Sequence, residues 1–283
     1  LTAVGIGASL DGTGEALAQV SYAQVTIGIP GSIPPVVASN IDLSGNFTIV
    51  ADPNSGESDG VPISLWTSSL SGISSSSWQT CHVGEYKNDD TVCVTDYDES
   101  TSTGNSGWGG CGCNAGEELS SAGAASYDLF EDKDNFPTDV FAYVFGGASE
   151  ATIKALAASQ NRVFTDCLGI YGIDLSTNPL IWVEGSCNLD DIGGKLTPVI
   201  LVVEGLLKVN AGTHAWGLLV TTGTMQLNGG PTIHGSIVST ASTKLTAGGY
   251  TQVYDPDILK QLSEDALISD LSKVKYSWKN YTN

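Results

Sequence analysis

Hydrophobic positions in the second half of the chain recur with an 18-residue period, which Val202, Val220 and Val238 keep. Other sets repeat in step with them, and each unit closes at a glycine: Leu201, Leu219 and Ile237; Val209, Leu227 and Leu245; Gly212, Gly230 and Gly248. Short self-similar units with glycine corners are typical of parallel strands stacked coil upon coil, about 4.8 Å apart. The pattern predicts a mostly β protein with a parallel β-solenoid over residues 180–254.

Other hydrophobic patterns predict single elements earlier in the chain. Phe47, Ile49 and Ala51 alternate with the residues between them, which predicts a strand with one buried face. The next strand is expected at residues 61–66.

The segments that precede the predicted solenoid are apolar in two different ways. Residues 139–145 carry aromatic residues at alternate positions, and we expect a strand with these aromatics on one face. Residues 150–164 have helical spacing, and Ser149 is the expected N-cap because its hydroxyl can accept a backbone N–H of the first turn.

A second helix is expected after the predicted solenoid, where Asp255-Pro256-Asp257 places proline in the first turn. Leucine and isoleucine form its apolar stripe: Ile258, Leu259, Leu262, Leu267 and Leu271. We expect this helix to cap the open end of the solenoid, which otherwise exposes unpaired strand edges. A short final strand is expected at 274–278.

The chain is expected to have three parts. Residues 1–179 form an irregular β portion that includes a cysteine-containing excursion at 68–126, residues 180–254 form the solenoid, and residues 255–283 hold the capping helix and the final strand. The excursion is rich in Ser, Gly and Asp. Because long loops without regular structure are usually functional or disordered, we expect the variable or binding part there.

Net charge removes several classes of partner. The chain has 11 Lys+Arg against 31 Asp+Glu, a net charge of −20. A polyanion repels phosphate backbones, so nucleic-acid binding is not expected, and an anionic membrane surface is disfavoured for the same reason. Nor does the sequence contain an apolar run of about 18 residues, so no membrane-spanning segment is expected in this fragment.

The even number of cysteines, 6, in an acidic chain favours disulfides and an exported location. Cys81 with Cys93, and Cys167 with Cys187, are the preferred pairs. Cys111 and Cys113 are too close in sequence to pair with each other easily. Connectivity is not fixed by sequence alone, so these two either pair elsewhere or stay free.

Acidic residues beside the cysteines are candidate metal ligands: Asp89, Asp90, Asp96 and Asp98. Ca²⁺ prefers several carboxylate and carbonyl oxygens, but solvated acidic loops are the simpler interpretation. A second set of oxygen donors is Asp132, Asp134 and Asn135. No cofactor is required by any motif in the chain.

Two tryptophans in the excursion, Trp78 and Trp108, are candidate contacts for a sugar or a protein. Aromatic rings with one polar group suit such surfaces. The alternative is that they fill a small core between disulfides, and the two interpretations stay open.

The sequence supports catalytic roles less well than structural ones. His234 follows Trp216 by one 18-residue step, so a residue stacked on a strand ladder is favoured over a general base. Glu184 and Glu204 are acids near the predicted coils, where paired carboxylates would suit glycoside hydrolysis. Solvated corners are the favoured interpretation, and we expect no enzyme.

Short segments from about residue 40 to the C-terminus also follow a known order. They are Gly45-Asn46-Phe47-Thr48, Asp52-Pro53-Asn54, 60–66, 141–146, 233–238, Tyr254-Asp255-Pro256-Asp257 with Leu259, and Ser277-Trp278. In this order the chain resembles the soluble part of the PilX-type large minor pilins, which are type IV pilus assembly proteins.

The resemblance implies an extracellular bacterial filament subunit without catalytic residues. Its expected partners are other pilins and a pilus-tip protein, and its expected role is to prime assembly or to display an adhesive surface, with a host or surface glycan as a further partner. Such proteins carry a hydrophobic helix that anchors the precursor in the inner membrane, and we expect one ahead of Leu1. The alternatives are a secreted carbohydrate-binding adhesin or surface protein and, ranked last, a β-helix polysaccharide-degrading enzyme.

Overall fold

A computed structural model describes residues 22–24, 33–51, 63–71, 77–88, 91–93, 111–125, 127–227, 229–240, 245–265 and 271–273. This part of the chain is mostly β, as predicted. The strands before the first α-helix are β1 (Tyr22–Gln24), β2 (Val36–Ala51), β3 (Leu65–Ser71), β4 (Trp78–His82), β5 (Tyr86–Asn88), β6 (Thr91–Val92), β7 (Gly112–Cys113), β8 (Ser120–Ser121) and β9 (Leu129–Glu131).

The later strands are β10 (Val163–Phe164), β11 (Leu180–Val183), β12 (Cys187–Leu189), β13 (Val199–Val203), β14 (Leu207–Val209), β15 (His214–Thr221), β16 (Met225–Leu227), β17 (Thr232–Ser239), β18 (Leu245–Val253) and β19 (Leu271–Lys273). The helices are α1 (Val140–Val144), α2 (Glu150–Ser159) and α3 (Pro256–Asp265), with 3₁₀ turns η1 (Val83–Glu85) and η2 (Cys167–Ile170). None of these helices is long and apolar enough to cross a membrane.

The later strands pair in parallel, in three series. In the first series, β11, β13, β15 and β17 are neighbours, and Val202 pairs with Val220, which pairs with Val238, as the 18-residue step predicts. The step is slightly wider at the start of the series, where Trp182 pairs with Val202.

The second series consists of β12, β14, β16 and β18. Val209 pairs with Leu227 as predicted, but Leu227 then pairs with Ala247 and not with Leu245. The step has lengthened here as well, so the strict repeat ends one unit earlier than expected. The third series joins the first parts of β15 and β17 to the last part of β18.

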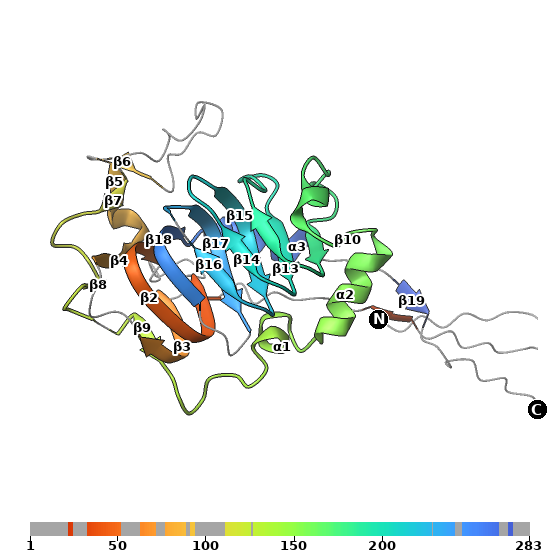
Figure 1. Cartoon of the computed structure of the whole chain (residues 1–283), viewed down its shortest axis with the longest axis horizontal. Coiled ribbons are helices and arrows are strands. Elements are labelled where there is room, and N and C mark those ends of the chain that lie inside the picture. Colours follow the sequence, from red (N-terminus) through yellow and green to blue (C-terminus); the bar gives the residue numbers. More distant parts are fainter. Residues whose placement is uncertain are drawn as a thin grey trace, which may run out of the picture.

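The early strands extend the same sheet. Strand β2 pairs in parallel with both β17 and β18, and β3 and β4 pair with β2 on its other side. Figure 1 shows these strands side by side along the long axis of the molecule. The first strand block in sequence therefore stacks on the last one. Strand β3 begins at Leu65, later than expected, and β4 belongs to this sheet although it falls in the predicted excursion.

Glycines allow the strands to turn where the first and third series meet. Gly217 and Gly235 are paired neighbours with φ of 139° and 118°, a range that favours glycine. A Cβ atom at Gly217 would overlap the carbonyl oxygen of Val199, and one at Gly235 would overlap that of Gly217. The close backbone approach thus depends on the missing side chains.

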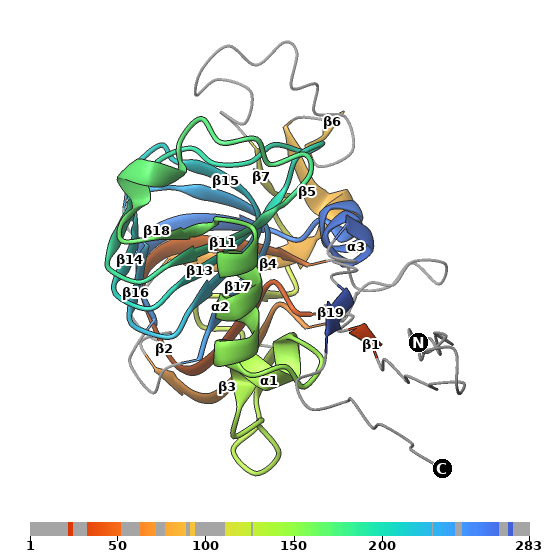
Figure 2. The same cartoon turned by 90° about the vertical axis from the view of Figure 1, so that its right-hand side faces the viewer.

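Two hydrophobic clusters hold the strands. One lies between the series and includes Leu201, Leu219 and Ile237. The other lies between the outer side of the sheet and the helices, where Val202 and Val220 share a cluster with residues of all three α-helices. Figure 2, which looks along the stack, shows α1, α2 and α3 outside the strands.

Helix α1 corrects one prediction. Residues 139–145 were expected to be a strand, but the side chain of Asp139 accepts a hydrogen bond from the Ala142 N–H (2.8 Å) and starts a short helix. Three of its residues are buried, and Tyr143, at 46 % exposure, is not. The local cap overrides the strand preference of aromatic and β-branched residues.

Helix α2 confirms its prediction, and the Ser149 hydroxyl accepts the Thr152 N–H as expected (3.3 Å). It ends at Ser159, before the predicted limit of residue 164.

Helix α3 forms where predicted but has a different role. It packs against β15 and β17 along the side of the stack, where Ile258, Leu259 and Leu262 are buried, and does not cap an end. The helix ends at Asp265, and Leu271 lies in β19, which pairs antiparallel with β1. The predicted strand at 274–278 lies outside the described residues.

Three disulfides connect all six cysteines. Cys167–Cys187 is confirmed. The predicted pairing of Cys81 with Cys93 is wrong: Cys81 bonds to Cys113, and Cys93 bonds to Cys111. Strands β5 and β7 pair antiparallel and return Cys111 and Cys113 to the same small sheet. Three disulfides indicate an oxidising compartment outside the cytoplasm.

Polar groups close the interior at the β3–β9 end. The Asp128 side chain is fully buried and accepts hydrogen bonds from the hydroxyls of Thr80 (2.6 Å) and Ser120. Its backbone carbonyl accepts the N–H groups of Ser64 and Leu65. Asp128 therefore joins β4 and β8 through its carboxylate and β3 through its backbone carbonyl, although the three strands are distant in sequence.

Candidate functional site

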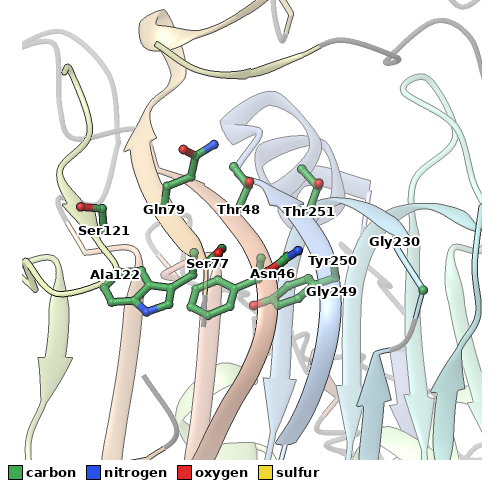
Figure 3. A pocket seen from close by; sticks show the side chains of 13 residues that line it. Asn46, Thr48, Ser77, Gln79, Ser121, Ala122, Gly230, Gly249, Tyr250 and Thr251 are labelled. Carbon is green, nitrogen blue, oxygen red and sulfur yellow. The ribbon is translucent and has the colours of Figure 1, made fainter. Parts of the chain in front are cut away.

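A groove of about 730 Å³ crosses three neighbouring strands, β18, β2 and β4, on the outer side of the third series. Its edge reaches β8 and the turn that precedes β17. Figure 3 shows the strands running side by side beneath the groove. It lies where strands from the two halves of the chain meet, so each half supplies part of its lining.

Aromatic rings form the floor of the groove. Tyr250, Phe47 and Trp78 hold matching positions on neighbouring strands. The ring of Phe47 stacks on that of Trp78, with centroids 5.5 Å apart, and lies 6.0 Å from that of Tyr250. All three side chains are buried, with exposed fractions of 4 % or less. The stacked rings stabilise the pairing of the three strands as cross-strand side-chain contacts.

Polar side chains form a row above this floor. Thr251, Thr48 and Gln79 are paired neighbours on β18, β2 and β4, one residue after the aromatic positions. Because successive side chains in a strand point to opposite faces, this row points outward, and Figure 3 shows the three side chains rising in the same direction. Ser121 continues the row on β8.

The described residues that line the groove carry no charged side chain. Tyr250 is the one ionisable side chain among the described residues that line it, and burial raises the pKa of its phenol, so it stays protonated at physiological pH. The groove offers hydroxyls, amides and backbone groups, on a protein whose net charge is −20.

Tyr86 connects the disulfide-linked segment, which lies between the bonded cysteines Cys81 and Cys113, to this row. Burial raises the pKa of its phenol to about 12, although a hydrogen bond with the Thr251 side chain acts in the opposite sense. Tyr86 lies on β5, whose partner β7 carries Cys113. The disulfide-linked segment therefore supports the groove from one side.

The residues predicted as ligand contacts have different outcomes. Trp78 reaches the groove, but as a buried part of its floor, with 4 % exposure. Trp108 and the four predicted Ca²⁺ ligands, Asp89, Asp90, Asp96 and Asp98, lie outside the described residues. In the second acidic set, Asp132 accepts hydrogen bonds from the backbone and side-chain N–H groups of Asn135.

Glu184 and Glu204 meet at a lysine, as an ion-pair cluster. The Nζ atom of Lys154 in α2 lies 2.8 Å from Glu184 Oε1 and 2.7 Å from Glu204 Oε1, and the Trp182 indole donates to Glu204 (2.8 Å). Burial raises the pKa of Glu204, but the hydrogen bonds from Lys154 and Trp182 outweigh it, and the pKa is lowered. Both acids therefore hold α2 on the stack.

His234 is buried against Trp216, with ring centroids 3.8 Å apart. The stacked position on a strand ladder is as predicted. Burial, and to a lesser extent the charges of His214 and Lys195, lowers its pKa well below the ordinary value. A neutral, buried imidazole supports packing at this position.

Apart from Trp78, the groove residues were not predicted as a site. Phe47 was expected to face the core, but no repeat relates β2 to β18 or β4, so the sequence does not indicate that their polar residues align. Comparison with protein-family models, curated proteins and solved structures yields no match to this chain.

Proposed function

We propose that this protein is a non-enzymatic structural and binding subunit of a bacterial type IV pilus, of the PilX-type minor pilin class. The ordered short segments that resemble this family support the proposal, and two of them, around Phe47 on β2 and around His234 on β17, lie on strands that both pair with β18. In this role the partners are other pilins and a pilus-tip protein.

We infer further that the parallel strands form a β-solenoid. Strands of the three series follow one another along the chain, successive units pair in register at a nearly constant step, and glycines without side chains occupy a tight corner. Strands β2, β3 and β4 add further units to the same stack. Such a body is a rigid spacer with a long side surface.

The observation that carries the proposal is the separation of the β1–β19 pair from the groove. Strands β1 and β19 pair, so residues 22–24 and 271–273 meet. Figure 1 places this pair at one end of the long axis and β4 and β8, which line the groove, toward the other. A body attached on the side of the β1–β19 pair would present the groove away from its attachment.

Disulfides support a role outside the cytoplasm. One of them, Cys81–Cys113, joins a strand of the groove to the neighbouring small sheet. Covalent links of this kind stabilise a surface that must keep its shape after export.

A free secreted carbohydrate-binding protein is the second candidate. The uncharged groove with its hydroxyl and amide row favours this role as much as a filament role. The two candidates differ in how the protein is attached, and not in what the groove binds.

The test is the sequence of the native protein ahead of Leu1. The proposal expects a short basic leader and then an apolar segment of about 20 residues that is retained in the mature protein, as mass spectrometry of the protein from native cells would show. A conventional secretory signal with no retained hydrophobic helix would reject the filament role in favour of the second candidate.

A further inference from the structure

The groove has a ligand chemistry that its lining defines. Its outward groups are hydroxyls and an amide, of Thr251, Thr48, Gln79 and Ser121, and the exposed side chains of Asn46 and Ser77 extend this set at the rim. Hydroxyls and amides both donate and accept hydrogen bonds. They match a neutral ligand that carries many hydroxyl groups, because such a ligand also needs donors and acceptors in turn.

The row also has a direction. Thr251, Thr48 and Gln79 occupy paired positions on neighbouring strands, which lie about 4.8 Å apart. The same kind of contact therefore repeats along the stack axis, across the strands. A linear chain of similar units is a better match for such a row than a single compact molecule.

An extended peptide matches the groove less well. Peptides that bind to sheets add a strand at a free edge, and each strand beneath the groove already has partners on both sides. Strand β2 lies between β18 and β4, β18 also pairs with β17, and β4 also pairs with β8. The groove thus offers side chains and no unpaired strand edge.

The aromatic floor makes the row rigid. The Trp78, Phe47 and Tyr250 rings are packed below the polar side chains and are not exposed as stacking surfaces. Preformed, ordered hydrogen-bonding groups reduce the entropy lost when a ligand binds. Recognition would therefore depend on the polar row and on the shape of the groove.

From these observations we propose that the groove binds a neutral polysaccharide chain, with successive sugar residues laid along Thr251, Thr48 and Gln79. The inference deepens the proposed display function by naming the ligand class of its groove. It can fail while the filament role stands, because binding and attachment are measured separately.

The experiment is isothermal titration calorimetry of the full chain with neutral cello-, chito- and malto-oligosaccharides, and with oligogalacturonate as the anionic probe of matched length. We expect at least one neutral series to bind, with affinity that rises with chain length, and the anionic probe to bind more weakly. Binding of none of the neutral series, or preference for the anionic probe, would overturn the proposal, as would tighter binding of an extended peptide to the groove.

Two variants locate the binding. Gln79→Ala removes a central amide of the row, and we expect the Kd to rise about tenfold, the effect of one lost hydrogen bond. Ala122→Trp places a large side chain at an exposed position of the lining, and we expect it to abolish binding. The matched control is Gln226→Ala, an outward glutamine on β16 in the second series, which should bind like the original protein.

Far-UV circular dichroism and thermal melting of each variant show that the fold is intact. Folded variants at Gln79 and Ala122 that bind as tightly as the control would place the sugar elsewhere and contradict the proposal. The filament role is tested independently, by whether the Gln79→Ala protein still sediments with the filament fraction of native cells.

Discussion

The later stack, β10 to β18, and the early strands, β2, β3 and β4, share one sheet but reach it in different ways. In the later stack, Leu201 pairs with Leu219 and Leu219 with Ile237, at a constant step. In the early block, Val37 pairs with Trp66 across a longer and irregular interval, and strand β9 joins β3 from beyond the disulfide-linked segment. Strand pairing in the later stack is local and periodic. Strand pairing in the early block depends on contacts that no sequence repeat indicates.

The groove lies at the junction of these two regions. Its row needs Thr251 from the periodic part and Thr48 and Gln79 from the other. A surface built from one repeat would show the same residues in each unit, whereas a junction combines unrelated residues. The regular region thus supplies most of the body, and the irregular region supplies most of the polar side chains that line the groove.

The largest expected effect is in the regular region. Gly217→Val would put a branched side chain against the Val199 carbonyl at φ of 139°, and strain together with overpacking should cost about 4 kcal/mol of unfolding free energy. Urea denaturation measures the loss. The control Gly84→Ala, where a Cβ atom has nothing within 4 Å, should change stability little, and equal effects in both variants would contradict the tight corner.

The early block should be most sensitive at Asp128. Asp128→Ala leaves the hydroxyls of Thr80 and Ser120 without their carboxylate partner in the buried end of the stack, which should cost about 3 kcal/mol. Asp128→Asn should cost less, because an amide oxygen still accepts. Asp134→Ala, at an exposed position, is the control, and denaturation in urea would show the order. A loss at Asp128 no larger than at Asp134 would mean that the carboxylate does not join the strands.

A smaller effect is expected from pH. Burial lowers the pKa of His234, so the unfolded state, with a pKa near 6.5, binds the proton more readily. The contribution of His234 to the free energy of unfolding is therefore fully present above pH 6.5. It falls as the pH drops below this value, by about 1.4 kcal/mol per pH unit for one proton. Asp255 acts in the opposite sense. Burial raises its pKa, so its contribution to stability is lost as the pH rises from the ordinary carboxyl pKa toward the raised one.

The variant that tests this effect is His234→Phe, which keeps a ring on Trp216. Its stability between pH 5.5 and 7 should be nearly flat, while the original protein should lose stability as the pH falls through this range. An unchanged slope in His234→Phe would show that another group takes up the proton.

The features that could be predicted from the sequence are local ones. The 18-residue step predicted the pairing of Val202 with Val220 and the stacking of Trp216 with His234, because a repeat encodes its own register. Ser149 predicted the start of α2, because a cap acts within one turn. Both signals are local.

What could not be predicted is non-local. No sequence feature of β2 indicates that it docks on β18, because parallel pairing between distant strands depends on the whole fold. The partner of Cys81 was missed because the antiparallel return of β7 decides it. The groove depends on both, so its polar row was not expected from any one segment.

The central claim, a filament subunit that displays this groove, is tested most directly by locating the protein on native cells. Antibodies against this chain would be used on filaments sheared from the cell surface and on the remaining cells and medium. We expect the protein to sediment with the filaments and to be absent from filaments of a strain that lacks its gene. Recovery only as free protein in the medium, from cells that make normal filaments, would contradict it.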